Sequence, residues 1–144
     1  MSDSPTLLRV LYIDDDEMAL TLTQLQLLRV GIHTETTSDV LEAVGILTTQ
    51  EVDLILLDSV MPSIDGVEFL QLIRSLHMKH PVVFFTGHGT EGLRELTREF
   101  DVLDILDKQV DRFHLAARLR ALHAAHVDNG VNPLDSFGAP RAAS

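Results

Sequence analysis

Carboxylates, a hydroxyl and an ammonium stand just after four short apolar runs of the sequence. They are Asp14, Asp15, Asp58, Thr86 and Lys108. Three carboxylates held close together repel one another, and a divalent cation that prefers oxygen ligands, such as Mg²⁺, relieves that repulsion. Phosphoryl transfer uses such a site, because it needs an in-line nucleophile, positive charge and fixed hydrogen-bond donors. These residue types together predict a carboxylate that accepts a phosphoryl group.

Asp58 is the predicted nucleophile. The apolar run 54–57 ends abruptly at this one carboxylate, and a loop that contains proline and closes with Asp65-Gly66 follows it. Such a run, bounded by turn residues, is typical of a short strand covered on both faces. Residue type indicates the remaining roles. Asp14 and Asp15 would hold the metal, and Lys108 would neutralise the charge of the phosphoryl group. Thr86 and the Gly87 amide would donate hydrogen bonds to it.

Alternating strands and helices are predicted to position these residues. The strands are 9–13, 32–36, 54–57, 82–85 and 102–106. The helices are 17–30, one capped by Ser38 or Asp39, one after Gly66 that ends near 77–80, a short one at 93–100, and one at about 111–126. Five such units imply a parallel sheet with helices on both faces. The second and fifth strands contain polar residues and are expected at the edges, which predicts an α/β, flavodoxin-like doubly wound (βα)5 fold with strand order 2-1-3-4-5.

Apolar residues at helical spacing predict the helix faces that pack on the sheet. In the first helix they are Met18, Leu22 and Leu25, at i, i+4 and i+7. The corresponding faces of the later helices are Val40, Val44 and Leu47; Leu70, Ile73 and Leu76; Leu93, Leu96 and Phe100; and Leu115, Leu119 and Leu122.

Length and composition are those of one globular domain. The 144 residues are 45% hydrophobic, and we expect a polar lead at 1–7, a domain at 8–126 and a flexible tail or linker at 127–144. No apolar run is long enough for a membrane span, and the start carries no signal-peptide pattern. The net charge of -11 argues against direct binding of nucleic acid. The absence of cysteine fits a cytoplasmic protein.

The motifs resemble those of a known family. Ile13-Asp14-Asp15-Asp16, the segment 58–66 (Asp-Ser-Val-Met-Pro-Ser-Ile-Asp-Gly), Thr86-Gly87 and Lys108 look like the receiver domain of two-component response regulators, CheY-like, over about residues 8 to 126. The resemblance implies transfer of phosphate, with Mg²⁺, from a phosphohistidine on a sensor histidine kinase or phosphotransfer protein to Asp58, and slow hydrolysis afterwards. It also implies a signalling switch rather than a conventional enzyme, and a metal ligand in the backbone carbonyl of Val60.

Some positions depart from the family pattern. The family usually follows its lysine with proline in a cis peptide, whereas Gln109 stands here, and it often has an aromatic ring at the position of Ile105. In the winged-helix transcription-factor branch, receivers dimerise through the fourth helix, fifth strand and fifth helix. Asp104 and Arg118 match two of the charged positions of that dimer, and His114 stands where an acid is expected.

Parts of the sequence also match three other functions. A haloacid-dehalogenase-like phosphohydrolase needs Asp-x-Asp at its nucleophile, and Val60 occupies the second position. Gly87-x-Gly89-x-x-Gly92 with Asp107 formally matches a dinucleotide fingerprint, but that site would normally follow the first strand. A receiver used only as an interaction module is kept open by Ile105 and Gln109.

Histidines offer further candidates. His77 with His80, and His123 with His126, have spacings that could share a metal, but neither pair has a third ligand nearby in the sequence, so interaction with the helix dipole is the preferred reading. His88, two residues past Thr86, could overhang the phosphoryl group and slow the attack of water.

Overall fold

The computed structural model describes residues 7–62, 64–87 and 92–130 of the chain. The strands are β1 (Arg9–Ile13), β2 (His33–Thr37), β3 (Leu54–Leu57), β4 (Val82–Thr86) and β5 (Val102–Asp107). The α-helices are α1 (Glu17–Leu28), α2 (Val40–Thr49), α3 (Gly66–Ser75), α4 (Leu93–Thr97) and α5 (Leu115–Gly130), with short 3₁₀ turns at Arg98–Phe100 and Arg112–His114.

The strands form one parallel sheet in the order β2-β1-β3-β4-β5, as the sequence predicted. Each neighbouring pair is parallel, and the register of β4 against β5 shifts between Val82 and Val83. The central strands β1, β3 and β4 are almost entirely buried, whereas β2 and β5 carry the half-buried positions expected of edges. The fold prediction is therefore confirmed.

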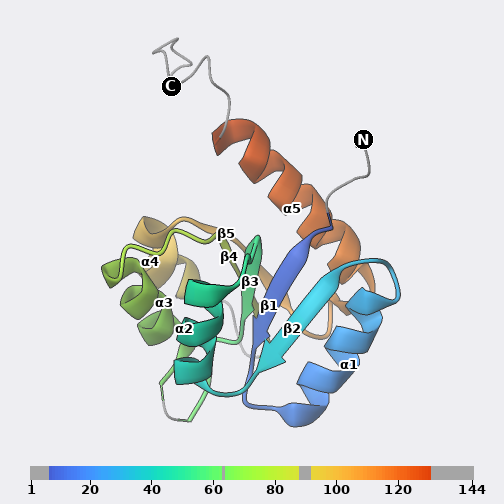
Figure 1. Cartoon of the computed structure of the whole chain (residues 1–144), viewed down its shortest axis with the longest axis horizontal. Coiled ribbons are helices and arrows are strands. Elements are labelled where there is room, and N and C mark those ends of the chain that lie inside the picture. Colours follow the sequence, from blue (N-terminus) through green and yellow to red (C-terminus); the bar gives the residue numbers. More distant parts are fainter. Residues whose placement is uncertain (1–6, 63, 88–91, 131–144) are drawn as a thin grey trace.

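Helices cover the sheet on both faces (Figure 1), with α1 and α5 on one face and α2, α3 and α4 on the other. Successive residues of each strand point to opposite faces, so each strand contributes to two separate cores. The core under α2, α3 and α4 contains Leu11, Ile55 and Phe84, and the core under α1 and α5 contains Tyr12, Leu56 and Phe85. The side chains just past the strand ends therefore lie on one face of the sheet or the other.

The predicted inner face of α1 is wrong. Met18, Leu22 and Leu25 are 70%, 54% and 53% exposed, and the residues that face the core are Ala19, Leu20, Thr23 and Leu27. The strict apolar spacing of i, i+4 and i+7 lies on the exposed side, whereas the buried side has Leu20 and Leu27 seven residues apart with the polar Thr23 between them, so spacing alone favoured the wrong side. The buried side is the one that places the small residues Ala19 and Thr23 next to the sheet. As a result, α1 presents an apolar outer surface.

The other predicted helix faces agree better with the structure. Leu70 and Ile73 of α3 are fully buried, and Leu76 is 47% exposed because the helix has ended at Ser75. Val40 and Val44 of α2 are partly buried around Ala43 and Leu47. The side chain of Leu96 lies outside the described residues.

The N-terminus of α3 is fixed by a capping box. Asp65 accepts a hydrogen bond from the Glu68 amide at 2.9 Å, and the Glu68 carboxylate accepts one from the Asp65 amide at 3.1 Å. This explains the Asp65-Gly66 pair as a helix start. Asp65 thus shapes the turn, as the sequence indicated.

Helix α5 begins and ends later than predicted. The segment from Asp111 first makes a 3₁₀ turn, and the helix then runs from Leu115 past His126 to Gly130 (Figure 1). Leu115 and Leu119 are fully buried against the sheet and Leu122 is partly buried. Within the described ranges, none of the helices combines the length and hydropathy that a bilayer crossing requires.

Candidate functional site

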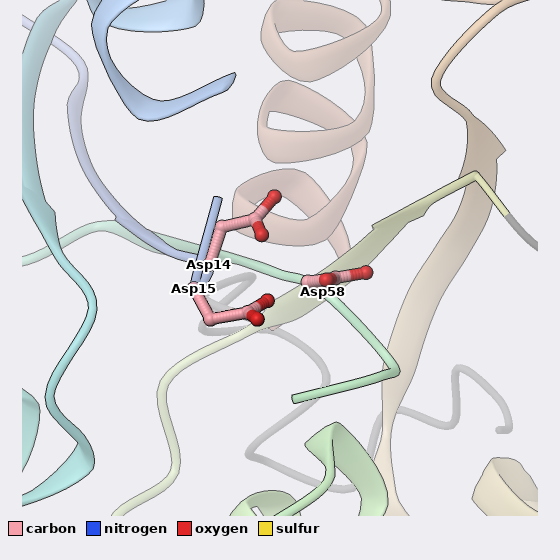
Figure 2. A group of neighbouring side chains, drawn as sticks. All are labelled: Asp14, Asp15 and Asp58. Atoms are coloured by element: carbon pink, nitrogen blue, oxygen red, sulfur yellow. The ribbon is translucent and has the colours of Figure 1, made fainter. Parts of the chain in front are cut away.

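Three carboxylates meet at the carboxyl ends of β1 and β3 (Figure 2). Oxygen atoms of Asp14, Asp15 and Asp58 lie within 4.8 Å of one another. Asp14 and Asp58 are 0% and 5% exposed, whereas Asp15 is exposed to solvent. In the described part of the chain this is the one cluster of metal-ligating side chains, so neither histidine pair belongs to such a site.

Parallel pairing of the strands brings these acids together. The Asp58 amide donates to the Ile13 carbonyl at 3.0 Å, which continues the pairing of β3 with β1 by one residue. The Asp14 amide donates to the Thr37 carbonyl at 3.2 Å and continues the pairing of β1 with β2 in the same way. Backbone hydrogen bonds to the neighbouring strand therefore hold Asp14 and Asp58 in place at the ends of β1 and β3.

Lys108 reaches this cluster from the end of β5. Its Nζ lies 2.5 Å from Asp14 Oδ2 and 3.8 Å from Asp58 Oδ2. Its amide donates to the Thr86 carbonyl at 2.9 Å, and the Asp107 carboxylate accepts hydrogen bonds from the amides of Gln109 and Val110. Every peptide bond among the described residues, including that between Lys108 and Gln109, is trans.

Thr86 lies at the end of β4 and is fully buried. Its Oγ1 is 2.8 Å from Oγ of Ser59, the residue that follows Asp58. The exposed Gly87 comes next, where an added Cβ would have Lys108 as its nearest neighbour at 3.8 Å. Ser59 was not among the predicted site residues, because a serine in a loop carries no signal for a partner twenty-seven residues away.

Tyr12 is a second residue that the sequence analysis missed. Its hydroxyl donates to Asp14 Oδ2 at 2.6 Å in a buried hydrogen bond. The other oxygen of Asp14 accepts from the Asp16 amide at 3.0 Å. The signal was present, since residues i and i+2 of a strand lie on the same face.

The pKa values of the two buried acids are shifted in opposite directions. Burial, followed by the nearby Asp14 charge, raises the pKa of Asp58 to about 7, although Lys108 acts in the opposite sense. Burial would also raise the pKa of Asp14, but hydrogen bonds from Lys108, Tyr12 and the Asp16 amide outweigh it and lower that pKa. Burial and the bond to Asp14 raise the pKa of Tyr12 far above its ordinary value, so its hydroxyl remains a donor.

The donor set fits a hard divalent cation. Oδ1 of Asp58 is buried, and no hydrogen-bond partner for it exists among the described residues. A buried carboxylate oxygen without a partner is costly, and a cation at the three acids would satisfy it. Val60, whose carbonyl is the fourth predicted ligand, is 51% exposed beside Asp58.

Gly66 packs against the backbone of the phosphoacceptor candidate. A Cβ at this position would lie 2.3 Å from the Asp58 carbonyl oxygen and 2.9 Å from both Phe84 and Ser59. Its amide donates to the Ser59 carbonyl at 3.0 Å. Only glycine allows the first turn of α3 to approach the end of β3 so closely.

Comparison with known proteins assigns the family. The family model of the response regulator receiver domain matches residues 10–120. The alkaline phosphatase synthesis transcriptional regulatory protein PhoP of Bacillus subtilis is 32% identical over 114 residues, which are 79% of this chain and 48% of that protein. The transcriptional regulatory protein CpxR of Escherichia coli gives the same identity and coverage. The chain belongs to the receiver domains of two-component response regulators, a family whose general function is signalling by phosphorylation.

Solved structures agree on the fold. A CheY-like receiver domain from Methanospirillum hungatei covers 87% of this chain and all of its own length, with a TM-score of 0.77 and 21% identity. The response regulator TrrA of Thermotoga maritima, solved with Mg²⁺ and BeF, covers 81% of this chain and 99% of its own, with a TM-score of 0.70 and 22% identity. The chain spans about half the length of the curated relatives quoted above.

Family membership argues against the phosphohydrolase and dinucleotide-binding alternatives. Part of the dinucleotide fingerprint, including Gly89, lies outside the described residues, and so does His88. The predicted role of His88 in slowing hydrolysis therefore stays a prediction. The chain is a signalling receiver rather than a conventional enzyme.

Proposed function

We propose that Asp58 accepts a phosphoryl group from a phosphohistidine of a sensor histidine kinase or phosphotransfer protein. One observation carries the proposal. The buried Asp58 carboxylate has an oxygen without a described partner, and it lies between two further acids and an ammonium group. Mg²⁺ would be held by Asp14, Asp15, Asp58 and the Val60 carbonyl. When bound there, it would offset the carboxylate charge and bind oxygens of the phosphoryl group.

The transfer is an in-line displacement at phosphorus. An oxygen of Asp58 forms the new bond to phosphorus as the bond to the histidine nitrogen breaks, so the phosphoryl group passes to the carboxylate without net redox change. In the metal-free protein the raised pKa of Asp58 favours protonation below about pH 7. A bound cation favours the ionised form, which is the nucleophile.

Two side chains change partners in this proposal. The Lys108 ammonium turns from Asp14 towards the new phosphoryl group, whose charge is larger. The Thr86 hydroxyl exchanges its contact with Ser59 for a phosphoryl oxygen, and the Gly87 amide donates beside it. Phosphorylation then acts as a local charge event that biases the position of the end of β4.

The output surface proposed for this switch is α4, β5 and α5, through which two copies could form a homodimer. In the single chain, Asp104 of β5 already pairs with Arg94 of α4 and Arg118 of α5. A dimer that used these charges would exchange pairs within one chain for pairs between two. The proposal includes a cytoplasmic location and no direct contact with nucleic acid, in line with the lack of cysteine and the charge of -11.

Incubation with acetyl phosphate and Mg²⁺, followed by intact-mass spectrometry, tests the acceptor. The wild-type protein should gain one phosphoryl group, and Asp58→Asn should gain none. Asp101→Asn is the matched control: it makes the same chemical change at a distant residue with φ of 59°, a conformation that asparagine tolerates, and it should react like the wild type.

The same experiment separates the phosphoacceptor from a receiver used only as an interaction module. A wild-type protein that is folded and binds Mg²⁺, yet gains no mass, would contradict the proposed transfer and favour the interaction module.

A further inference from the structure

The Tyr12 ring is fixed beneath the acidic site. Tyr12 is fully buried in the core under α1 and α5, and its ring centroid lies 6.1 Å from that of Phe85 with an interplanar angle of 59°. The guanidinium of Arg112 lies over the other aromatic ring, 5.3 Å from its centroid. A ring packed in this way leaves the hydroxyl in one position, because close-packed side chains do not swing freely.

Asp14 shares one of its oxygens between two donors. Both the Tyr12 hydroxyl and the Lys108 ammonium lie within hydrogen-bond distance of Oδ2, at 2.6 and 2.5 Å. Oδ1 accepts from the Asp16 amide. A fully buried carboxylate needs such donors to stay ionised and in place. The two side-chain donors differ in one respect: Lys108 is 18% exposed on a long flexible side chain, whereas Tyr12 is fully buried in a packed core.

We propose that Tyr12 is a positioning residue that holds Asp14 at the cation site when Lys108 turns to the phosphoryl group. This inference rests on the proposed function, because only phosphoryl transfer gives Lys108 a reason to leave. The Asp16 amide and the Tyr12 hydroxyl would then be the remaining donors to Asp14. Without the hydroxyl, Asp14 would lose its side-chain support at the step in which the cation must be held.

A polar chain behind Tyr12 supports the same assignment. Thr23 of α1 is fully buried and contacts the Tyr12 hydroxyl, and its Oγ1 accepts a hydrogen bond from Arg112 at 3.2 Å. The Arg112 carbonyl accepts from the Gln26 side chain at 2.6 Å. The Tyr12 hydroxyl is therefore oriented from one side by α1 and directed at Asp14 on the other.

The test measures Mg²⁺ binding to the full chain by calorimetry in four proteins: wild type, Tyr12→Phe, Lys108→Ala and the double variant. Lys108→Ala imitates the state in which the ammonium has left Asp14. In that background Tyr12→Phe should raise the Mg²⁺ dissociation constant about tenfold, the size of effect expected for a lost bond to a charged group. With Lys108 present the effect should be smaller, about threefold or less, because the ammonium still holds Oδ2.

Thr34→Val is the matched control. It removes another buried hydroxyl, which donates to the Ile32 carbonyl at 3.2 Å on the edge strand away from the site. It should leave the Mg²⁺ dissociation constant unchanged in both backgrounds. If the Tyr12 hydroxyl had a merely structural role, Tyr12→Phe would also leave the Mg²⁺ dissociation constant unchanged. It would lower only the unfolding temperature.

The wild-type protein offers an independent readout. Tyr12 is the single tyrosine and the chain has no tryptophan, so the near-ultraviolet tyrosine absorption band reports on this ring. Addition of Mg²⁺ should shift that band with the dissociation constant found by calorimetry. An unchanged band, or a Tyr12→Phe effect below about twofold in the Lys108→Ala background, would overturn this inference alone. A wild-type protein that bound no Mg²⁺ would overturn the proposed function with it.

Discussion

The two faces of the sheet carry different parts of the site. The face under α1 and α5 continues past the strand ends into Asp14, Asp58 and Lys108, and so holds the charges. The face under α2, α3 and α4 continues into Ser59 and Thr86, which share a contact between hydroxyls. The alternation of side chains along each strand produces this division. A phosphoryl group on Asp58 would therefore add charge on one face, and the Thr86 hydroxyl, which follows Phe84 and Phe85 in β4, would respond on the other.

The largest effect should come from that aromatic pair, Phe84 and Phe85, which are fully buried on opposite faces of β4. Truncation of either to alanine should lower the free energy of unfolding by about 3–5 kcal/mol. The milder Phe84→Leu and Phe85→Leu variants should differ in function, since Phe85 alone packs on Tyr12. We expect weaker Mg²⁺ binding for Phe85→Leu and unchanged binding for Phe84→Leu, measured by calorimetry. Equal weakening would show that the two faces are not independent.

A smaller effect should appear in the pH dependence of the charged face. The pKa of Asp58 in the folded, metal-free protein is about 7, above the ordinary value of 3.8. Between these values the folded state binds more protons than the unfolded state, so the free energy of unfolding should fall as pH rises. From pH 5 to pH 8 the contribution of Asp58 to this fall should be on the order of 2 kcal/mol in urea titrations without divalent cations, and His80, whose pKa burial lowers, acts in the opposite direction.

Asp58→Asn should remove most of this pH dependence and should be more stable than the wild type at pH 8. Asp101→Asn should keep the wild-type slope. A wild-type protein whose stability rose over the same pH interval would contradict the assignment of burial and the Asp14 charge as the dominant influences on Asp58.

The hydroxyl face should respond more weakly. Ser59→Ala removes the contact with Thr86 and should lower the free energy of unfolding by about 1 kcal/mol. Because Ser59 lies on the face opposite to Asp14 and Asp58, its loss should leave the Mg²⁺ dissociation constant unchanged. Chemical denaturation and calorimetry on the same samples would check both parts, and a changed dissociation constant would mean that the two faces share more than Thr86.

The smallest effect is expected at the exposed ion pairs. Arg118 is 42% exposed in its side chain and pairs with Asp104 and Asp111. Arg118→Ala should cost less than about 1 kcal/mol, and the difference should diminish in high salt, because exposed pairs are screened by solvent and ions. A loss of several kcal/mol would indicate that this pair supports the fold rather than the surface.

The sequence predicted the parts of the site that depend on strand order alone. Asp14 and Asp58 follow buried strands, and parallel pairing then leaves them side by side. The contact of Tyr12 with Asp14 was within reach of the sequence, because the two residues stand at i and i+2 of one strand. The contact of Ser59 with Thr86 joins two distant segments and is settled by packing. The outward turn of Met18, Leu22 and Leu25 was missed for a related reason: a helix that is apolar on two sides fits the sheet by size and shape, which spacing does not record.

Gly66 brings α3 into direct contact with the backbone of Asp58, the proposed phosphoacceptor. Its missing side chain lets the helix rest directly on the backbone of residues 58 and 59, and its amide ties the two together. Closely packed contacts of this kind transmit displacement rather than absorb it. Helix α3 and the end of β3 should therefore move as one rigid unit, and a protein bound to the outer side of α3 would displace Asp58, the proposed phosphoacceptor.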